Sequence, residues 1–244
     1  MTHAPLPDTT KYWSRAEDRQ RRINALFYRG AQHYDRACGI MAFGSGQAYR
    51  RTALERAGLR QGMHVLDVGT GTGLLAREAV QIVGASGRVV GLDPSMKMME
   101  AGRGRLEMGR VQGLGERLPF ADGRFDFVTM GYALRHVPDL DQTFLEYMRV
   151  LKPGGRVLLL EITKPRSFLG TMAARVYFGS VVPGLARLST RSADASELMK
   201  FYWDTIAQCV APEIVLASLR RTGFAAERTV IAGIFSEYTT DPRS

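Results

Sequence analysis

Three glycines at alternate positions, Gly69, Gly71 and Gly73, directly follow a short apolar segment. Glycine has no Cβ, so such a loop turns tightly and its backbone N–H groups can approach a ligand closely. A second apolar segment, Arg88–Leu92, ends on Asp93. An acidic residue about twenty positions beyond a glycine loop typically accepts hydrogen bonds from ribose hydroxyls. The spacing therefore predicts a nucleoside-cofactor site at the carboxyl ends of two parallel strands.

The glycine loop alone leaves two classes of cofactor open, because Gly71, Gly73 and Ala76 also match the dinucleotide pattern G-x-G-x-x-G/A. Asp67, two residues before the loop, would repel a diphosphate, whereas it suits the sulfonium and ammonium groups of S-adenosylmethionine. No tyrosine is followed four residues later by lysine, so the catalytic pair of short-chain dehydrogenases is absent. These observations favour S-adenosylmethionine. Each aspartate also has a structural alternative to ligand binding: Asp67 could cap the loop, and Asp93 could cap a helix.

The elements that must position these residues alternate along the chain. Strands are expected at 63–68, 87–93, 110–113, 125–130 and 156–162, and helices between them at 74–83, 95–107 and 140–151. Alternating strands and helices are typical of an α/β fold with a doubly wound parallel sheet. Helices from about residue 19 and over 47–57, with a loop at 39–46, should precede this core. A helix at 213–222 and two strands within 224–237 should close it.

Two stretches depart from this alternation. Residues 1–18 are polar and contain prolines, so they are expected to be mobile. Residues 19–244 should form a single domain. Within it, residues 166–211 show no strand pattern and are rich in aromatic residues, which predicts a helical insertion lying over the carboxyl edge of the sheet.

Charge and composition narrow the classes of partner. The formal net charge is +9, and arginines cluster at 15–22, 50–51, 103–110 and 220–221. Such charge can attract a membrane surface, although a solvated helix surface is the plain alternative. No basic strand interleaved with aromatic residues occurs, so nucleic acid is not expected.

Metal and membrane-spanning signals are missing from the sequence. Cys38 and Cys209 are far apart and the four histidines lack ligand spacing, so no metal is expected. No apolar run reaches the roughly eighteen residues needed to cross a bilayer, and the N-terminus has no apolar signal core. The expected location is cytoplasmic, with peripheral contact to the inner membrane.

The chain resembles a known family, the ubiquinone/menaquinone biosynthesis C-methyltransferases of UbiE type, from about Ile23 to the last strand. The matching blocks are Tyr34–Asp35, Met41–Gly44, Val65–Gly73, Glu116–Phe120, Phe125–Asp126, Ala133–Val137, Arg149–Gly155 and Leu160–Pro165. The resemblance implies a class I methyltransferase fold of Rossmann-like type: a seven-stranded, mostly parallel sheet with helices on both faces and a helical lid. It also implies S-adenosylmethionine-dependent C-methylation of an aromatic or quinol ring.

Two other functions stay open at this point. One is a tailoring N-, O- or C-methyltransferase of a soluble aromatic or terpenoid metabolite. The other is a catalytically silent scaffold subunit, against which the intact Asp67, Asp93 and glycines weigh. A homodimer is a further expectation.

Carried over residue by residue, the family pattern implies a set of cofactor contacts. They are Tyr34, Asp67, Gly69, Gly71, Thr72, Gly73, Asp93, Met96, Leu114, Gly115 and Gly131. At the positions of Leu114 and Gly115 the family has Asn or Asp followed by Ala. The side chain of that Asn or Asp accepts a hydrogen bond from the adenine amino group. Leucine cannot accept that hydrogen bond, and its loss costs on the order of 1 kcal/mol. Gly131 replaces a small polar residue common at that strand end.

The expected chemistry centres on Arg135, which follows the fourth strand. A fixed positive charge there could lower the pKa of a phenol and hold the phenolate whose ring carbon is methylated. An ion pair with Asp139 or Asp141 is the alternative. His136 could accept the ring proton, although an ordinary packed histidine is the favoured interpretation. Contacts with the acceptor ring are expected from Phe43, Tyr132 and Tyr202, of which the last two could also be plain core.

Overall fold

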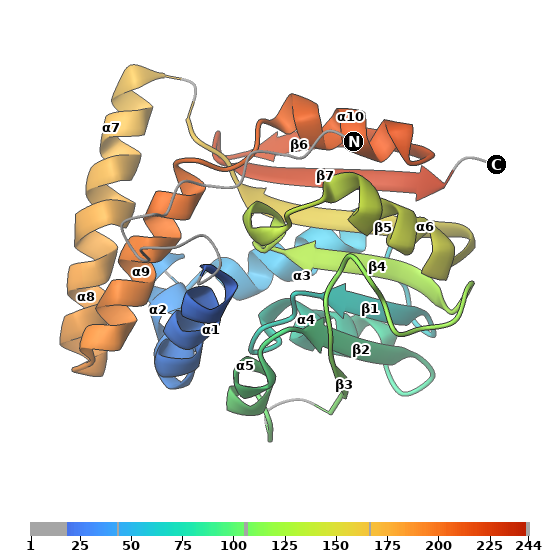
Figure 1. Cartoon of the computed structure of the whole chain (residues 1–244), viewed down its shortest axis with the longest axis horizontal. Helices are drawn as coiled ribbons and strands as arrows, with labels where there is room; N and C mark the ends of the chain where they lie inside the picture. The colour runs from blue at the N-terminus through green and yellow to red at the C-terminus, as the bar shows by residue number, and fades with distance from the viewer. Residues whose placement is uncertain (1–18, 43, 105–106, 166, 243–244) are drawn as a thin grey trace.

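A seven-stranded sheet forms the centre of the molecule (Figure 1). The computed structural model describes residues 19–42, 44–104, 107–165 and 167–242, so the expected mobile segment 1–18 lies outside the described residues. The strands are β1 His64–Val68, β2 Arg88–Asp93, β3 Gly109–Gln112, β4 Phe125–Gly131, β5 Leu151–Ile162, β6 Phe224–Ile231 and β7 Phe235–Pro242. Their order is β3-β2-β1-β4-β5-β7-β6, with β7 antiparallel to both its neighbours and the rest parallel. The expected α/β fold is confirmed.

Helices cover both faces of the sheet. Successive strand residues point to opposite sides, and both sets of side chains are apolar, so both faces must be buried. On one face, α3 Gly46–Arg56 and α4 Leu74–Val83 pack on Val65, Phe127 and Leu158. On the other, α6 Leu140–Val150 and α10 Pro212–Arg221 pack on the residues next to these in sequence, which are Leu66, Val128 and Leu159. The apolar strands predicted from the sequence are therefore buried on both sides.

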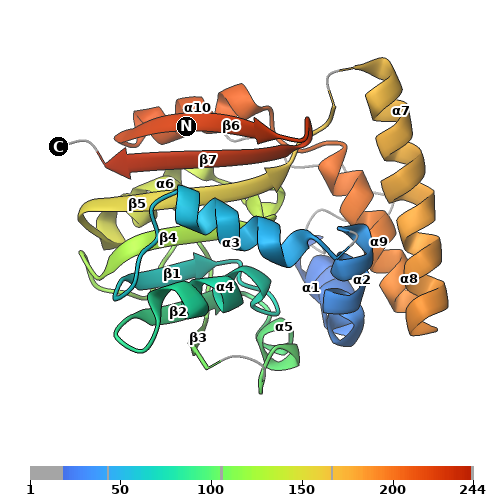
Figure 2. The same ribbon diagram turned by 180° about the vertical axis from the view of Figure 1, so that it is seen from behind.

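The remaining helices gather beyond the carboxyl ends of the parallel strands (Figures 1 and 2). They are α1 Arg19–Gly30, η3 Ala31–His33, α2 Tyr34–Met41, α5 Met96–Ala101, η4 Leu134–His136, α7 Phe168–Val176, the π-helical η5 Tyr177–Val181, α8 Val182–Thr190 and α9 Ala193–Ile206. A third apolar cluster joins α2, α8 and α9, with Ala37, Val182 and Leu198 buried in it. Helices thus occupy the stretch in which an insertion was expected.

Side-chain caps fix where several of these helices begin. Ser95, Asp139, Ser167 and Ser192 each accept a hydrogen bond from the backbone N–H three residues later. Such a cap satisfies one of the N–H groups that have no partner within the helix, which stabilises the helix by about 1 kcal/mol.

Element boundaries differ from the sequence prediction in four places. Strand β5 begins at Leu151, five residues before the expected start at 156. Helix α5 ends at Ala101, six residues before the expected end. Gly102 follows, and its backbone packs so closely on Thr72 that a Cβ would meet the carbonyl oxygen. Helix α2 continues through Gly39, part of the expected loop, to Met41. Strand β7 runs to Pro242 because it pairs with β6 along its full length.

Candidate functional site

The glycine turn between β1 and α4 has the geometry that the sequence requires. Gly69, Gly71 and Gly73 have φ angles of 67°, 57° and 84°. Side chains are strained in this left-handed region, whereas glycine is not. A Cβ on Gly69 would lie 2.7 Å from the Cβ of Ala133. The turn therefore has no side chains at its three glycines, and its backbone is accessible to a ligand where β1 and β4 end.

Asp93 holds this turn in place from the end of β2. Its carboxylate accepts hydrogen bonds from the backbone N–H groups of Gly71, at 2.9 Å, and Ser95, at 2.8 Å. Only 8% of the residue is exposed, and burial raises the pKa of the carboxyl to about 6. An ionised carboxylate can accept about four hydrogen bonds, so both oxygens keep a free lone pair for ribose hydroxyls.

Asp67 places a second carboxylate beside the turn. It accepts hydrogen bonds from the hydroxyls of Thr70 and Thr129, each at 2.6 Å. Burial raises the pKa of Asp67 to about 6, although the two hydroxyl donors favour the charged form. A buried carboxylate with hydroxyl donors on both oxygens is a fixed negative charge above pH 6, which suits a cationic ligand.

A cavity of about 220 Å³, here called the Asp93 cavity, lies against the turn. Its lining includes Asp93, Leu114 and Gly115 from the ends of β2 and β3. The Leu114 side chain is 51% exposed, so it forms the rim and not the floor. Glu116 lines the same cavity, and burial raises the pKa of its carboxyl. A polar acceptor is thus present two residues beyond the position where the sequence lacks one.

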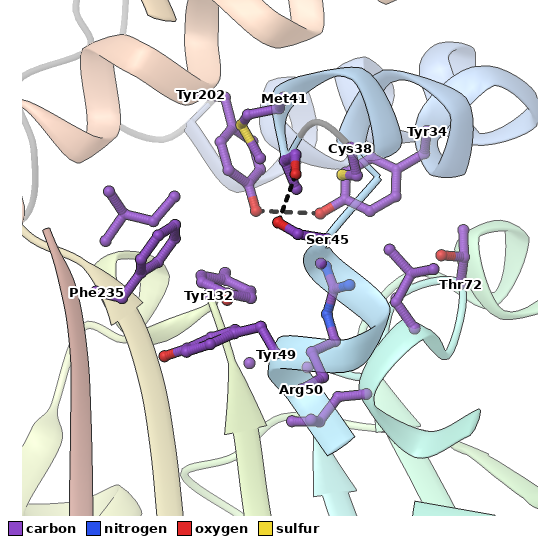
Figure 3. A pocket seen from close by; sticks show the side chains of 18 of the residues that line it. Tyr34, Cys38, Met41, Ser45, Tyr49, Arg50, Thr72, Tyr132, Tyr202 and Phe235 are labelled. Carbon is purple, nitrogen blue, oxygen red and sulfur yellow. Dashed lines mark hydrogen bonds between the residues drawn. The ribbon is translucent and has the colours of Figure 1, made fainter. Parts of the chain in front are cut away.

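A second cavity of about 250 Å³, the Arg50 cavity, is also lined by residues of the turn, and Figure 3 shows it from close by. The two cavities share part of their lining, namely Tyr34, Gly69, Gly71, Gly131, Tyr132 and Tyr202. At this junction the hydroxyls of Tyr34 and Tyr202 are 3.1 Å apart and hydrogen-bonded (Figure 3). Burial raises the pKa of both phenols, so they stay protonated. One O–H donates to the other hydroxyl, and the second O–H can donate to a ligand.

Tyr132 is held in a strained conformation at the same junction. Its φ is 60°, which is rare for a bulky residue, and its backbone N–H donates to the carbonyl of Leu160 at 2.7 Å. Strain of this kind costs on the order of 1–3 kcal/mol and concentrates at ligand sites. The ring forms one wall of the Arg50 cavity, opposite Thr72 and near Tyr49 and Phe235 (Figure 3).

Arg135 lies behind this site and lines neither cavity. Its guanidinium forms an ion pair with Glu161 at 2.7 Å and donates to the Thr205 hydroxyl at 3.0 Å. The pair is buried, and Glu161 raises the pKa of Arg135, so the guanidinium stays charged. Its link to the cavities is Tyr202, whose ring centre is 4.1 Å from the guanidinium carbon.

The alternative ion pair that the sequence offered for Arg135 is wrong. Asp139 caps α6 by accepting from Gln142, and Asp141 pairs with Arg221 at 2.8 Å. Both carboxylates have partners on the surface, whereas Arg135 points inward to β5. A direct contact of Arg135 with a phenolate is not what this arrangement offers, because its guanidinium lines neither cavity and lies against the ring of Tyr202.

The other expected site residues divide between the cavities. His136 lines the Asp93 cavity and stacks on Phe201 with ring centres 5.9 Å apart, so its proton-accepting role stays a prediction. Thr72 lines the Arg50 cavity. Gly73 shapes the turn without lining either cavity, and Phe43 lies outside the described residues.

Met96 lies away from both cavities and is 38% exposed, and Met98 lines the Asp93 cavity in its place. Sequence reasoning also missed Tyr49 and Arg50. They belong to α3, whose sequence carries no motif, and only the fold brings them to the turn. No group of residues that could hold a metal occurs in the described ranges.

The strand order, the bare glycine turn and the acid that ends β2 define a class I methyltransferase that uses S-adenosylmethionine. The contacts expected from the sequence, Asp93 with the ribose and Asp67 with the cationic methionyl end, stay predictions. The chain belongs to the ubiE/COQ5 methyltransferase family, whose model matches residues 15–231.

Relatives named ubiquinone/menaquinone biosynthesis C-methyltransferase UbiE align over most of the chain. The protein of Shewanella piezotolerans is 36% identical over 191 residues, which are 75% of this chain and 76% of the relative. That of Saccharophagus degradans is 32% identical over 232 residues, covering 91% and 92%. Among solved structures, a SAM-dependent methyltransferase of Thermotoga maritima, described as a possible histamine N-methyltransferase, matches in fold. Its TM-score is 0.63 at 21% identity, covering 90% of this chain and 99% of that one.

Proposed function

We propose that this methyltransferase acts on a ring carbon of a reduced quinone that carries an isoprenoid tail. The names of its relatives support this class of acceptor. The observation that carries the proposal is the connection of the ring-sized Arg50 cavity to a much larger apolar one.

The larger cavity, here called the Arg228 cavity, has a volume of about 1120 Å³. It adjoins the Arg50 cavity, because both are lined by Met41, Ala42, Ser45, Phe178, Ala232 and Phe235. Apolar residues of α7, α9 and β6 continue the lining, among them Ala173, Ile206 and Val230. An aromatic ring beside the glycine turn would thus have an apolar path for a long substituent.

The chemistry needs alignment more than covalent help from the protein. S-adenosylmethionine, when bound, supplies a methyl group already activated on a sulfonium. The acceptor's ring carbon would take this methyl group and would then lose its proton to a nearby base. The chain must hold the acceptor in line and exclude water, and such positioning can supply about 7–11 kcal/mol.

Protein groups at the junction suit these tasks. Tyr34 and Tyr202 are both protonated, and the O–H that is not used in the hydrogen bond between them can donate to the acceptor oxygen and stabilise its ionised form. Tyr132 and Phe235 provide aromatic walls for the ring. Arg135 is proposed to hold Tyr202 in place. His136, proposed to accept the ring proton, lines only the Asp93 cavity, so the ring must lie at the junction of the two cavities for this transfer.

The reaction can be tested with methyl-labelled S-adenosylmethionine and a panel of demethylated quinols, some with and some without isoprenoid tails. Mass spectrometry should show transfer of the label to a ring carbon of tailed quinols. Transfer to tail-less aromatic compounds alone would favour the soluble-metabolite alternative. Transfer to none, with cofactor bound, would favour the scaffold alternative.

Filling the Arg228 cavity should select against tailed acceptors. Ala173 is exposed on α7 and lines this cavity, so Ala173→Phe can fold while narrowing the path. We expect KM for a tailed quinol to rise roughly ten-fold, the effect of losing about 1.4 kcal/mol of apolar contact. Steady-state kinetics on tailed and tail-less acceptors measures this. Ala217→Phe, on the exposed side of α10, is the matched control, and equal effects on both acceptors would contradict the assignment.

We also propose that the enzyme collects its acceptor at a membrane surface. Helices α7 and α8 expose large apolar side chains: Phe168 78%, Leu169 79%, Met172 48%, Val176 57%, Leu185 43% and Leu188 77%. Arg175 and Arg187 are exposed on the same helices and could contact anionic headgroups. Because α7 also borders the Arg228 cavity, a tail could pass from lipid into it.

Within the described residues no helix is long and apolar enough to cross a membrane. Dimerisation stays a prediction.

Vesicle flotation tests the membrane contact. The wild-type protein should float with vesicles containing anionic lipid, and less with neutral ones. The double variant Phe168→Ser with Leu169→Ser should lose most of this binding, since each exposed apolar side chain contributes about 1.5–3 kcal/mol when buried. Methylation of a detergent-solubilised quinol should persist in the variant. Undiminished flotation would exclude this face.

A further inference from the structure

Arg50 is a cation inside the site that the function described so far does not use. It lies on α3, is partly buried and lines the Arg50 cavity. Its side chain rises from α3 into the space between Tyr132 and Thr72 (Figure 3). Across the described chain its guanidinium forms no ion pair or hydrogen bond; its recorded contact is with the Tyr132 ring, 5.7 Å from the ring centre.

The carboxylates around the cavity are engaged elsewhere. Asp67 accepts from Thr70 and Thr129, and Asp35 lies 3.5 Å from Arg77. Glu237 forms a bidentate pair with Arg56, at 2.7 and 3.0 Å, and Glu161 pairs with Arg135. These interactions leave the positive charge of Arg50 without a carboxylate of its own.

The neutral groups near Arg50 do not supply a negative charge either. Burial raises the pKa of the Cys38 thiol to about 11, and it raises that of the Tyr132 phenol as well. Both groups therefore stay protonated near neutral pH. The rest of the wall near the guanidinium is largely apolar, with Met41, Leu74 and Leu75. A planar guanidinium in such surroundings gains most from an oxyanion.

We infer that Arg50 is an anion-binding residue, whose guanidinium holds a single negatively charged oxygen group of a ligand in this cavity. Two ligands of the proposed reaction carry such a group. The cofactor carries the carboxylate of its methionyl part, and the acceptor carries the ionised hydroxyl of its ring. The second source rests on the proposed function, whereas the first rests only on cofactor binding.

The first arm of the test measures cofactor binding by calorimetry. S-adenosylhomocysteine carries the carboxylate, and 5′-methylthioadenosine lacks it. If Arg50 holds the carboxylate, Arg50→Gln should weaken the binding of S-adenosylhomocysteine about 10- to 100-fold. The affinity for 5′-methylthioadenosine should not change. Arg50→Lys should recover part of the loss. Arg51→Gln is the matched control, because Arg51 is the next residue of α3 but pairs on the surface with Glu55.

The second arm uses 4-nitrophenol, whose ionisation is visible by absorbance, in the presence of S-adenosylhomocysteine. If Arg50 holds a phenolate, the wild-type protein should lower the pKa of the bound phenol. Arg50→Gln should abolish that shift, whereas Arg50→Lys and Arg51→Gln retain it. Since neither arm requires turnover, a failure to methylate any quinol would refute the proposed function without touching this inference. Unchanged S-adenosylhomocysteine affinity together with an unchanged nitrophenol pKa in Arg50→Gln would refute the inference.

Discussion

Asp93→Ala should weaken the binding of S-adenosylhomocysteine by about 2–3 kcal/mol, which is roughly 30- to 150-fold in Kd. Two losses add up to this effect. The ribose hydroxyls lose their acceptor, and the backbone N–H groups of Gly71 and Ser95 lose theirs. The second loss loosens the glycine turn, on which the methionyl end also depends. Isothermal titration calorimetry at pH 7.5, above the raised pKa of Asp93, measures the change.

A second variant separates the two losses. Asp93→Asn keeps one oxygen acceptor but replaces the other with an N–H donor, which faces either Gly71 or Ser95 unfavourably. We expect intermediate affinity and a lower thermal stability of the free protein. Wild-type affinity in Asp93→Ala would contradict the assignment of the ribose site.

The fold was predictable because its signals are local. Glycines at alternate positions permit a left-handed turn that other residues would resist, and the strands are short apolar runs, which favour burial on both faces. Boundaries were less predictable where the determinant is distant. Helix α5, for example, ends where Gly102 packs on Thr72, thirty residues earlier in the chain.

The position of a candidate-site residue was predictable only within one residue of a strand end. Asp67, Asp93 and Tyr132 belong to that class, since parallel strands end at one edge of the sheet. Tyr34 and Tyr202 are 168 residues apart, so no spacing could reveal the hydrogen bond between their hydroxyls. Arg135 shows the same limit. Its position after β4 was readable, but its partner Glu161 comes from β5, and local sequence pointed instead to two nearby aspartates.

Arg135→Ala should destabilise the fold by about 3–5 kcal/mol, because it leaves the Glu161 carboxylate buried without its counter-charge. Chemical denaturation followed by circular dichroism measures this. Arg135→Lys should cost less, since it keeps the charge but loses the planar geometry that reaches both Glu161 and Thr205. A loss of activity in Arg135→Ala is therefore ambiguous by itself.

The double variant Arg135→Met with Glu161→Leu resolves the ambiguity. Apolar residues of similar volume often replace a buried ion pair without loss of stability, so the double variant should recover most of the unfolding free energy. It also removes the cation that lies 4.1 Å from the Tyr202 ring. If Arg135 acts on the acceptor through Tyr202, the folded double variant should have a lower kcat with little change in cofactor affinity. Its pH–rate profile should also rise at higher pH, because the acceptor phenol would ionise less readily. A stable double variant with normal turnover and an unshifted pH profile would make the pair purely structural and leave the tyrosines to act without it.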